Sequence, residues 1–227
     1  GKDFTLVFGC LRDFFRLRRE LGMMAGAFVV GSAAHALTSS DFIGDLLAIL
    51  KKLGIACLHA PLKHELQLTG AISSRFSAIV TADRRFIQLC SQDCDVVLFK
   101  LTGQPEYERM SPETVKLEMG ATPEQVPTYL ALTDGPPESV LTGQQATRLV
   151  ALFGDLDSIY KNMTKVSSAE IRMKLERFES CIRGRFADSM CCTDMHTRGR
   201  RVDPESFLGI DTKENCKTLR DYGFFSL

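Results

Sequence analysis

Hydrophobic residues recur along the first half of the chain in two patterns. Apolar residues at helical spacing predict helices over residues 4–15, 40–53, 63–73 and 83–90. Short apolar runs predict the strands between them, over residues 27–30, 55–58, 77–81 and 95–101. Because strands that alternate with amphipathic helices form parallel sheets, we expect an α/β fold with a mostly parallel sheet flanked by helices.

The second half of the chain, beyond about Gly103, lacks strand patterns. Ser111 and Thr122 each precede a proline, a combination that begins helices. Further helices are predicted over residues 143–153 and 167–186. We therefore predict two domains, an α/β domain over residues 1–103 and an all-helical domain over residues 104–227.

Composition narrows the class of protein. The 227 residues hold 28 Lys and Arg against 28 Asp and Glu, so the net charge is zero. A protein that binds nucleic acid over its whole surface would be basic, and this class is excluded. Charge is nevertheless uneven: residues 104–138 hold seven acidic and two basic side chains, whereas residues 161–201 hold ten basic and five acidic ones. Any contact with nucleic acid should therefore be local.

Two further features bear on the cellular setting. The eight cysteines show no C-x-x-C spacing, which favours a reducing intracellular compartment. Leu21 to Ser40 carries no Asp, Glu, Lys or Arg, but its glycines, serines and histidine argue for a helix end, a strand and a loop. We expect no membrane helix and no contact with a membrane.

Four stretches, in order along the chain, resemble the 5′–3′ exonuclease domain of bacterial DNA polymerase I and its flap-endonuclease relatives. They are Leu46 to Pro61, Tyr107 to Leu132, Arg148 to Ile159 and Leu219 to Leu227. The resemblance implies a PIN-like sheet, followed by a helical domain with a truncated helix–three-turn–helix that resembles the DNA-binding domain of such exonucleases. It also implies that the first strand of the sheet is missing from residues 1–103.

Relatives of this kind cleave phosphodiesters with two divalent metals held by clustered carboxylates. On the matching positions, the carboxylates that remain are Asp83, Glu138, Asp134 and Glu65. Other matching positions hold Ser32, Leu66, Gln67 and Arg85 instead. Because Arg85 places a positive charge where a dication should sit, we expect a chain without a catalytic site and without a metal or other cofactor.

Each remnant also has a simpler interpretation. Asp83 stands at a strand-to-helix junction, where Asp commonly caps the helix, and Arg85 can pair with Asp83 or with Glu138. Glu65 fits a solvated helix face. A zinc site of His196, Cys191 and Cys192 lacks a fourth ligand, and Cys90 and Cys94 fit buried thiols.

Basic and amide side chains mark two candidate nucleic-acid contacts. The densest arginine cluster consists of Arg183, Arg185, Arg198, Arg200 and Arg201. It suits phosphate or an acidic protein partner, and a solvated face is the alternative. The second contact, implied by the resemblance, is formed by Gln144, Gln145, Thr147 and Arg148.

The preferred function is a catalytically inactive, exonuclease-like subunit, structural or RNA-contacting, of a larger ribonucleoprotein assembly such as an organellar ribosome or its assembly machinery. Its partners would be protein subunits and RNA, with no small-molecule substrate. Bacterial-type polymerase I exonucleases in eukaryotes tend to serve organelles, so the resemblance implies a mitochondrial location. The alternative is a divergent metal-dependent nuclease, using Mg²⁺, or a flap- or duplex-binding module, completed by a partner or by a missing N-terminal segment.

Overall fold

The computed structural model describes residues 5–20, 22, 27–31, 40–53, 55–60, 65–100 and 106–191. Two compact units divide between Thr69 and Gly70. We call the described residues up to Thr69 unit 1 and those from Gly70 to Cys191 unit 2. The domain boundary predicted at residues 103 and 104 is a different division and stays a prediction.

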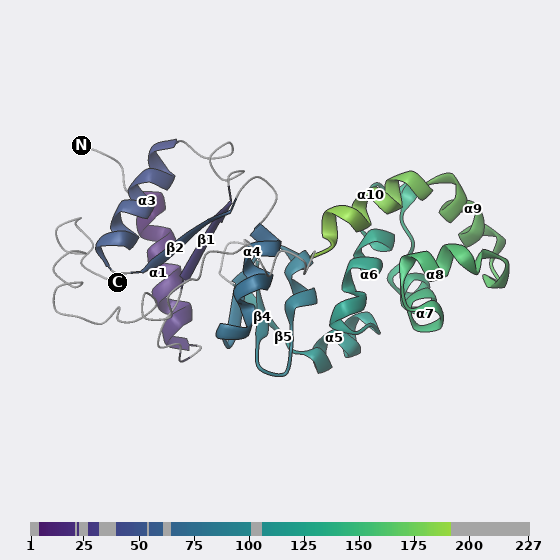
Figure 1. Ribbon diagram of the computed structural model, residues 1–227, viewed down its shortest axis with the longest axis horizontal. Coiled ribbons are helices and arrows are strands. Elements are labelled where there is room, and N and C mark those ends of the chain that lie inside the picture. The colour runs from purple at the N-terminus through teal and green to yellow at the C-terminus, as the bar shows by residue number, and fades with distance from the viewer. Residues whose placement is uncertain are drawn as a thin grey trace. The chain divides into compact units, whose positions relative to one another are not determined.

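Unit 1 contains a two-stranded parallel sheet and the helices beside it (Figure 1). Its elements are α1 (Thr5–Glu20), β1 (Ala27–Gly31), α3 (Ser40–Lys52), β2 (Ala56–Ala60) and the start of α4 (Glu65–Ile72). The apolar core joins Leu11 of α1 to Ile49 and Leu50 of α3, and all three side chains are 0% exposed. The apolar spacing that predicted these helices therefore marks the residues that are buried.

Unit 2 begins with a three-stranded sheet in the order β3-β4-β5, formed by β3 (Ala78–Thr81), β4 (Asp95–Lys100) and β5 (Glu106–Met110). β3 and β4 are parallel, as predicted. A 3₁₀ turn, η1 (Ser73–Arg75), precedes β3, and the helix predicted between β3 and β4 is the 3₁₀ helix η2 (Arg84–Leu89). Together with unit 1, two of the three strand pairings among the described residues are parallel, so the predicted α/β fold with a mostly parallel sheet is confirmed.

β5 corrects the prediction that strands end before Gly103. It pairs with β4 in antiparallel register, with Met110 opposite Val96. Tyr107 and Arg109 are exposed, and Arg109 forms an ion pair with Asp95 on the neighbouring strand. A short, charged strand at a sheet edge carries little apolar signal, which is why the hydrophobic pattern did not reveal it.

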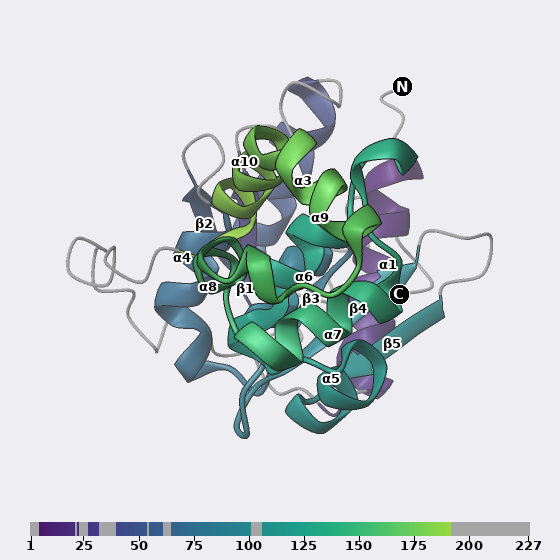
Figure 2. The same ribbon diagram turned by 90° about the vertical axis from the view of Figure 1, so that its right-hand side faces the viewer.

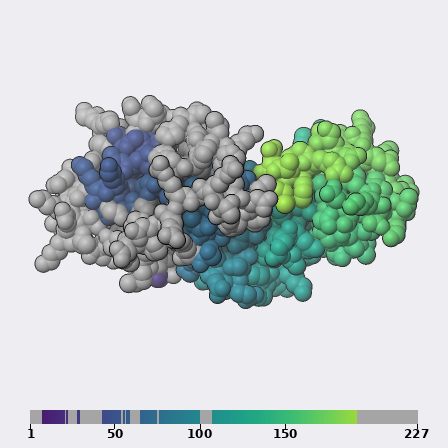
Figure 3. Space-filling view, in the orientation of Figure 1, coloured from purple at the N-terminus to yellow at the C-terminus, as the bar shows by residue number. Residues whose placement is uncertain are grey.

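Helices form the rest of the described part of unit 2 (Figure 2). In chain order they are α5 (Pro112–Met119), η3 (Pro123–Gln125), α6 (Val126–Thr133), η4 (Pro137–Ser139), α7 (Gly143–Phe153), α8 (Leu156–Lys161), η5 (Met163–Lys165), α9 (Ala169–Arg177) and α10 (Glu179–Ser189). Helices begin after Ser111 and Thr122, as predicted. Ser111 caps α5, and Thr122 forms a capping box with Gln125 before η3. In the space-filling view the side chains of α7 to α10 form one continuous surface (Figure 3).

One predicted helix is divided in two, and another ends where the sequence predicts. The single helix expected over residues 167–186 is two helices, because the backbone leaves helical geometry at Phe178, with φ −113° and ψ 18°. No proline or glycine marks that break. Between α7 and α8, Gly154 has a φ of +84°, a conformation that glycine adopts without strain, and Asp155 then caps α8.

No described helix is long and apolar enough to cross a membrane. Within Leu21 to Ser40, the described segment Ala27–Gly31 is β1, as the sequence predicted.

Candidate site: a hollow lined by paired arginines and aspartates

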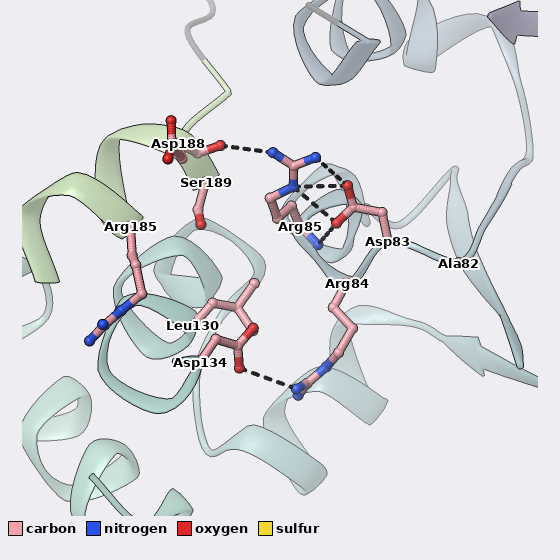
Figure 4. Close-up of a pocket in the computed structure, with 9 residues that line it drawn as sticks. All are labelled: Ala82, Asp83, Arg84, Arg85, Leu130, Asp134, Arg185, Asp188 and Ser189. Carbon is pink, nitrogen blue, oxygen red and sulfur yellow. Dashed lines mark hydrogen bonds and ion pairs between the residues drawn. The ribbon is translucent and has the colours of Figure 1, made fainter. Parts of the chain in front are cut away.

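A hollow of about 380 Å³ lies in unit 2, at the end of β3 (Figure 4). The residues that line it come from the β3–η2 junction, from α6 and its end, and from α10. They are Ala82, Asp83, Arg84, Arg85, Leu130, Asp134, Arg185, Asp188 and Ser189. Three arginines thus balance three aspartates around one cavity.

Asp83 caps η2, as predicted. Its Oδ1 accepts a hydrogen bond from the backbone N–H of Arg85, at 2.9 Å. The guanidinium of Arg85 turns back onto the same carboxylate, with Nε 2.8 Å from Oδ2 and 3.0 Å from Oδ1, and Nη2 also bonded to Oδ2. Of the two partners expected for Arg85, Asp83 is the one it holds, and the charge of that carboxylate is compensated within its own turn.

Arg85 also reaches across the hollow to α10. Its Nη1 donates to the backbone oxygen of Asp188 at 3.1 Å (Figure 4). Nearby, the side chain of Gln88 donates to Ser189 O at 2.6 Å and accepts from Cys191 N at 2.8 Å. These bonds attach the end of α10 to η2.

Asp134 lies on the opposite side of the hollow and faces Arg84. The two side chains form an ion pair at 3.5 Å, and each is about half exposed, at 49% and 50% respectively. Asp134 also accepts a hydrogen bond from Thr133 Oγ1 at 3.3 Å. A single long contact between exposed groups is weak, so Arg84 and Asp134 are held more loosely than Arg85 and Asp83.

Arg185 holds the connection between α6 and α7. Its Nε donates to Ala131 O at 2.9 Å, while its two Nη atoms donate to the side chain and the backbone oxygen of Ser139 at 3.2 Å. Gly135 has a φ of +143°, and a Cβ there would lie 2.8 Å from Arg185 Nη1. The guanidinium therefore packs against a backbone that only glycine allows to approach so closely.

The remaining carboxylates expected in an acidic site lie elsewhere. Glu138 is exposed on η4 and does not line the hollow. Glu65 is half-buried in the first turn of α4, in unit 1, and Leu66 beside it is buried. The structure thus brings Asp83 and Asp134 to one cavity and leaves Glu138 and Glu65 out of it.

A divalent metal does not fit this arrangement. A hard cation takes several oxygen ligands with free lone pairs, yet Arg85 occupies both oxygens of Asp83 and Arg84 faces Asp134. A dication bound to Asp83 would also lie close to the Arg85 guanidinium, with repulsion of several kcal/mol. Within the described segments, no three His, Cys, Asp or Glu side chains gather as a metal site.

The predicted basic cluster divides into described and undescribed residues. Arg183 binds Asp157 at 2.8 Å and Glu179 at 2.7 Å, and it lies 4.6 Å over the ring of Tyr160. Hydrogen bonds to those carboxylates raise the pKa of Arg183. Arg198, Arg200 and Arg201 lie outside the described residues. Arg183 is exposed and forms surface ion pairs, whereas Arg185 is partly buried, and phosphate contact by this cluster stays a prediction.

The second predicted contact lies at the start of α7. Thr142 and Gln145 form a capping box, in which the Gln145 side chain accepts from Thr142 N at 3.0 Å. Thr147 donates to Met119 O at 2.7 Å. Gln144 and Arg148 are exposed one turn apart. Of the predicted residues on α7, these two present their side chains to solvent, whereas Gln145 and Thr147 have structural partners.

Among the described cysteines, Cys10, Cys57, Cys90, Cys94 and Cys181 are free thiols. Burial raises the pKa of Cys90 and of Cys94 to about 11, and Cys90 Sγ donates to Met110 O. These two are buried thiols, as predicted. Cys191 is buried as well, and the other members of the proposed zinc group, Cys192 and His196, lie outside the described residues.

Sequence reasoning missed part of the hollow. Arg84 stands beside Arg85, yet nothing local connects it to Asp134, which is distant in sequence. Asp188 contributes a backbone oxygen, for which no side-chain pattern exists. The run Asp83-Arg84-Arg85 at a strand end was the one available signal, because opposite charges on a tight turn can pair.

The fold is that of a 5′–3′ exonuclease. The T5 5′-exonuclease with bound zinc ions superposes with a TM-score of 0.60 at 10% identity, covering 96% of this chain and 91% of that one. A T5 flap endonuclease complex with DNA and metal ions gives 0.59 at 9% identity, over 97% and 90% of the two chains. The predicted PIN-like class is therefore confirmed, whereas a helix–three-turn–helix stays a prediction.

Sequence relatives agree with the fold. The chain is 26% identical over 204 residues to the thermostable DNA polymerase I of Thermus filiformis, covering 78% of this chain and 24% of the relative. It is 29% identical over 175 residues to DNA polymerase I of Mycobacterium tuberculosis, covering 70% and 18%. The chain thus spans a quarter or less of these relatives. No family model matches the chain. The similarity to these polymerases confirms the resemblance to the 5′–3′ exonuclease domain of DNA polymerase I.

Proposed function

We propose that this chain is a nuclease-fold protein that binds nucleic acid without cleaving it. The observation that carries the proposal is the pairing of Asp83 with Arg85, since it places a fixed guanidinium on a carboxylate that matches a metal ligand of the family. Arg84 pairs with the second matching carboxylate, Asp134. With both charges compensated by side chains, the cleft has little need of a dication.

The binding part of the proposal rests on the fold. The T5 flap endonuclease of the same fold is described in a complex with DNA, and the exposed Gln144 and Arg148 of α7 suit the same kind of ligand. We further propose that the chain acts as a structural or RNA-contacting subunit of a ribonucleoprotein assembly with other protein subunits. We also propose a mitochondrial location, for which the family resemblance is the support.

A cleavage assay tests the catalytic part of the proposal. The purified chain is incubated with labelled 5′-flap DNA, nicked duplex and single-stranded RNA, with Mg²⁺ or Mn²⁺. We expect no metal-dependent product, because Asp83 and Asp134 are both paired with arginines. Metal-dependent cleavage that disappears in Asp83→Ala would overturn the proposal in favour of a divergent nuclease.

Copurification tests the assembly part. A tagged chain expressed in its native cells should recover ribosomal RNA and ribosomal proteins. Recovery of a replication complex instead would contradict the ribonucleoprotein assignment while leaving the non-cleaving site intact.

A further inference from the structure

Helix α5 carries apolar side chains on two opposite faces. Val115 and Met119, which are 0% and 4% exposed, lie one turn apart and pack into unit 2. Leu117 stands two residues from each of them, so it projects from the opposite face, and it is 86% exposed. A helix that covers a core on one side ordinarily presents polar residues on the other. The structure covers the inner face of α5 and leaves Leu117 in contact with solvent.

The outward face of α5 is held in place before any partner binds. Ser111 caps the first turn, and Gly120 ends the helix in the left-handed conformation, with a φ of 63°. From α7, Thr147 donates a hydrogen bond to Met119 O at 2.7 Å. A surface that is already ordered loses little conformational entropy on binding. Leu117 is therefore an apolar side chain on a fixed support.

The surroundings of Leu117 are acidic. Glu113, one turn before it, and Glu118, beside it, are exposed, and so is Glu124 on η3, the next element along the chain. Lys116 is the single basic residue of α5 and η3. A negative surface repels the phosphates of nucleic acid and attracts a positively charged protein. The charge of this face therefore favours a basic protein over RNA or DNA.

We infer that the outward face of α5 is the docking surface for a basic protein, with Leu117 in an apolar pocket of that protein and its Lys or Arg side chains facing Glu113 and Glu118. This inference rests on the proposed function, in which the chain belongs to an assembly with other protein subunits, and it names the surface and the chemistry of one partner. Protein contact through α5 also differs from the nucleic-acid contact proposed for Gln144 and Arg148 of α7.

Site-specific photocrosslinking in the native assembly tests this surface. A benzophenone amino acid replaces Leu117 in the tagged full chain, expressed in its native cells. In a matched variant it replaces Leu152, which is 73% exposed on α7 and has Arg148, a base, one turn before it. Mass spectrometry identifies the crosslinked partner. We expect a crosslink from position 117 to one basic protein, with a pI above about 9, and none to that protein from position 152.

Further variants separate the apolar contact from the charge. Leu117→Ser removes the apolar side chain, and Glu113→Lys with Glu118→Lys reverses the charge beside it. Each should lower the recovery of the crosslinked protein with the tagged chain roughly tenfold, and the loss from charge reversal should shrink at high salt. Leu152→Ser should leave the recovery unchanged. Thermal unfolding of each variant checks that the fold is retained, as expected for exposed side chains.

Different results would contradict this inference and the proposed function. If the unmodified chain recovers ribosomal RNA and proteins, but position 117 crosslinks to RNA, to a protein that is not basic or to nothing, this inference alone is wrong. The same holds if Leu117→Ser and Leu152→Ser recover the partner equally well. If the unmodified chain recovers no ribonucleoprotein, the assembly part of the proposed function fails together with this inference.

Discussion

The apolar core of unit 1 and the charged hollow of unit 2 are held together by different forces. The core joins Leu11, Ile49, Leu50 and Leu53, all fully buried, through contacts that have no required direction. The hollow joins three distant segments through guanidinium bonds to carboxylate and carbonyl oxygens, and its charged groups are partly exposed. Apolar burial stabilises the fold, whereas a few directional hydrogen bonds between charged groups decide what the hollow can bind.

The largest expected effect lies in the core. Leu50→Ala removes a side chain that is 0% exposed and should lower the free energy of unfolding by about 2–5 kcal/mol. Leu152→Ala, at a side chain that is 73% exposed, is the matched control and should change it by less than about 0.5 kcal/mol. Urea unfolding measures both. Similar small losses in the two variants would contradict the assignment of the core.

Alkaline pH should lower the free energy of unfolding through two buried thiols, whereas the arginines of the hollow should keep their charges. Burial raises the pKa of Cys90 and Cys94 from 9.0 to about 11, so the folded chain keeps thiol protons that the unfolded chain loses. Their contribution is fully present below pH 9 and is lost as pH rises toward 11, by roughly 1 kcal/mol per thiol at pH 10. Arginines stay charged throughout this range.

Urea unfolding at a series of pH values between 8 and about 10.5 measures this loss. Replacing both thiols, as Cys90→Ala with Cys94→Ala, should flatten the dependence on pH. Cys181→Ala, at an exposed thiol, should leave it unchanged. Tyr160, whose pKa burial raises to about 12, adds a further loss above pH 10. A double variant as steep as the unmodified chain would refute the role of the two thiols.

Smaller effects should distinguish the two ion pairs of the hollow. Arg85→Gln breaks a forked pair and a bond to α10, and we expect a loss of about 1 kcal/mol. Arg84→Gln breaks one long contact and should cost less than about 0.5 kcal/mol. Arg85→Asp should cost more than Arg85→Gln, because it adds a like charge beside Asp83. Equal losses for Arg84→Gln and Arg85→Gln would show that the pairs do not differ.

The same contrast explains what the sequence could predict. Apolar spacing placed α1 and α3 and the residues that they bury, because burial repeats with the period of the helix. The Asp83 cap and its pairing with Arg85 were predictable because both partners lie within one turn. Such features depend on neighbours along the chain.

Features that depend on distant segments escaped prediction. The pair of Arg84 with Asp134 and the bond of Arg85 to Asp188 O exist only because α6 and α10 fold against η2. The nucleic-acid contact predicted for Arg185 stays a prediction, but its hydrogen bonds to Ala131 and Ser139 could not be predicted from the sequence. The sequence shows that these arginine side chains are positively charged hydrogen-bond donors. Which oxygens they bind is decided by the fold.

The smallest expected effect is the most direct test of the central claim, that side-chain cations occupy the place of metal ions in the hollow. Thermal unfolding is measured with EDTA and with millimolar Mg²⁺ or Mn²⁺. A ligand that binds the folded state raises the melting temperature, and here we expect it to stay unchanged, because arginines already compensate Asp83 and Asp134. A metal-dependent rise of several degrees in the unmodified chain, lost in Asp83→Ala, would contradict the claim.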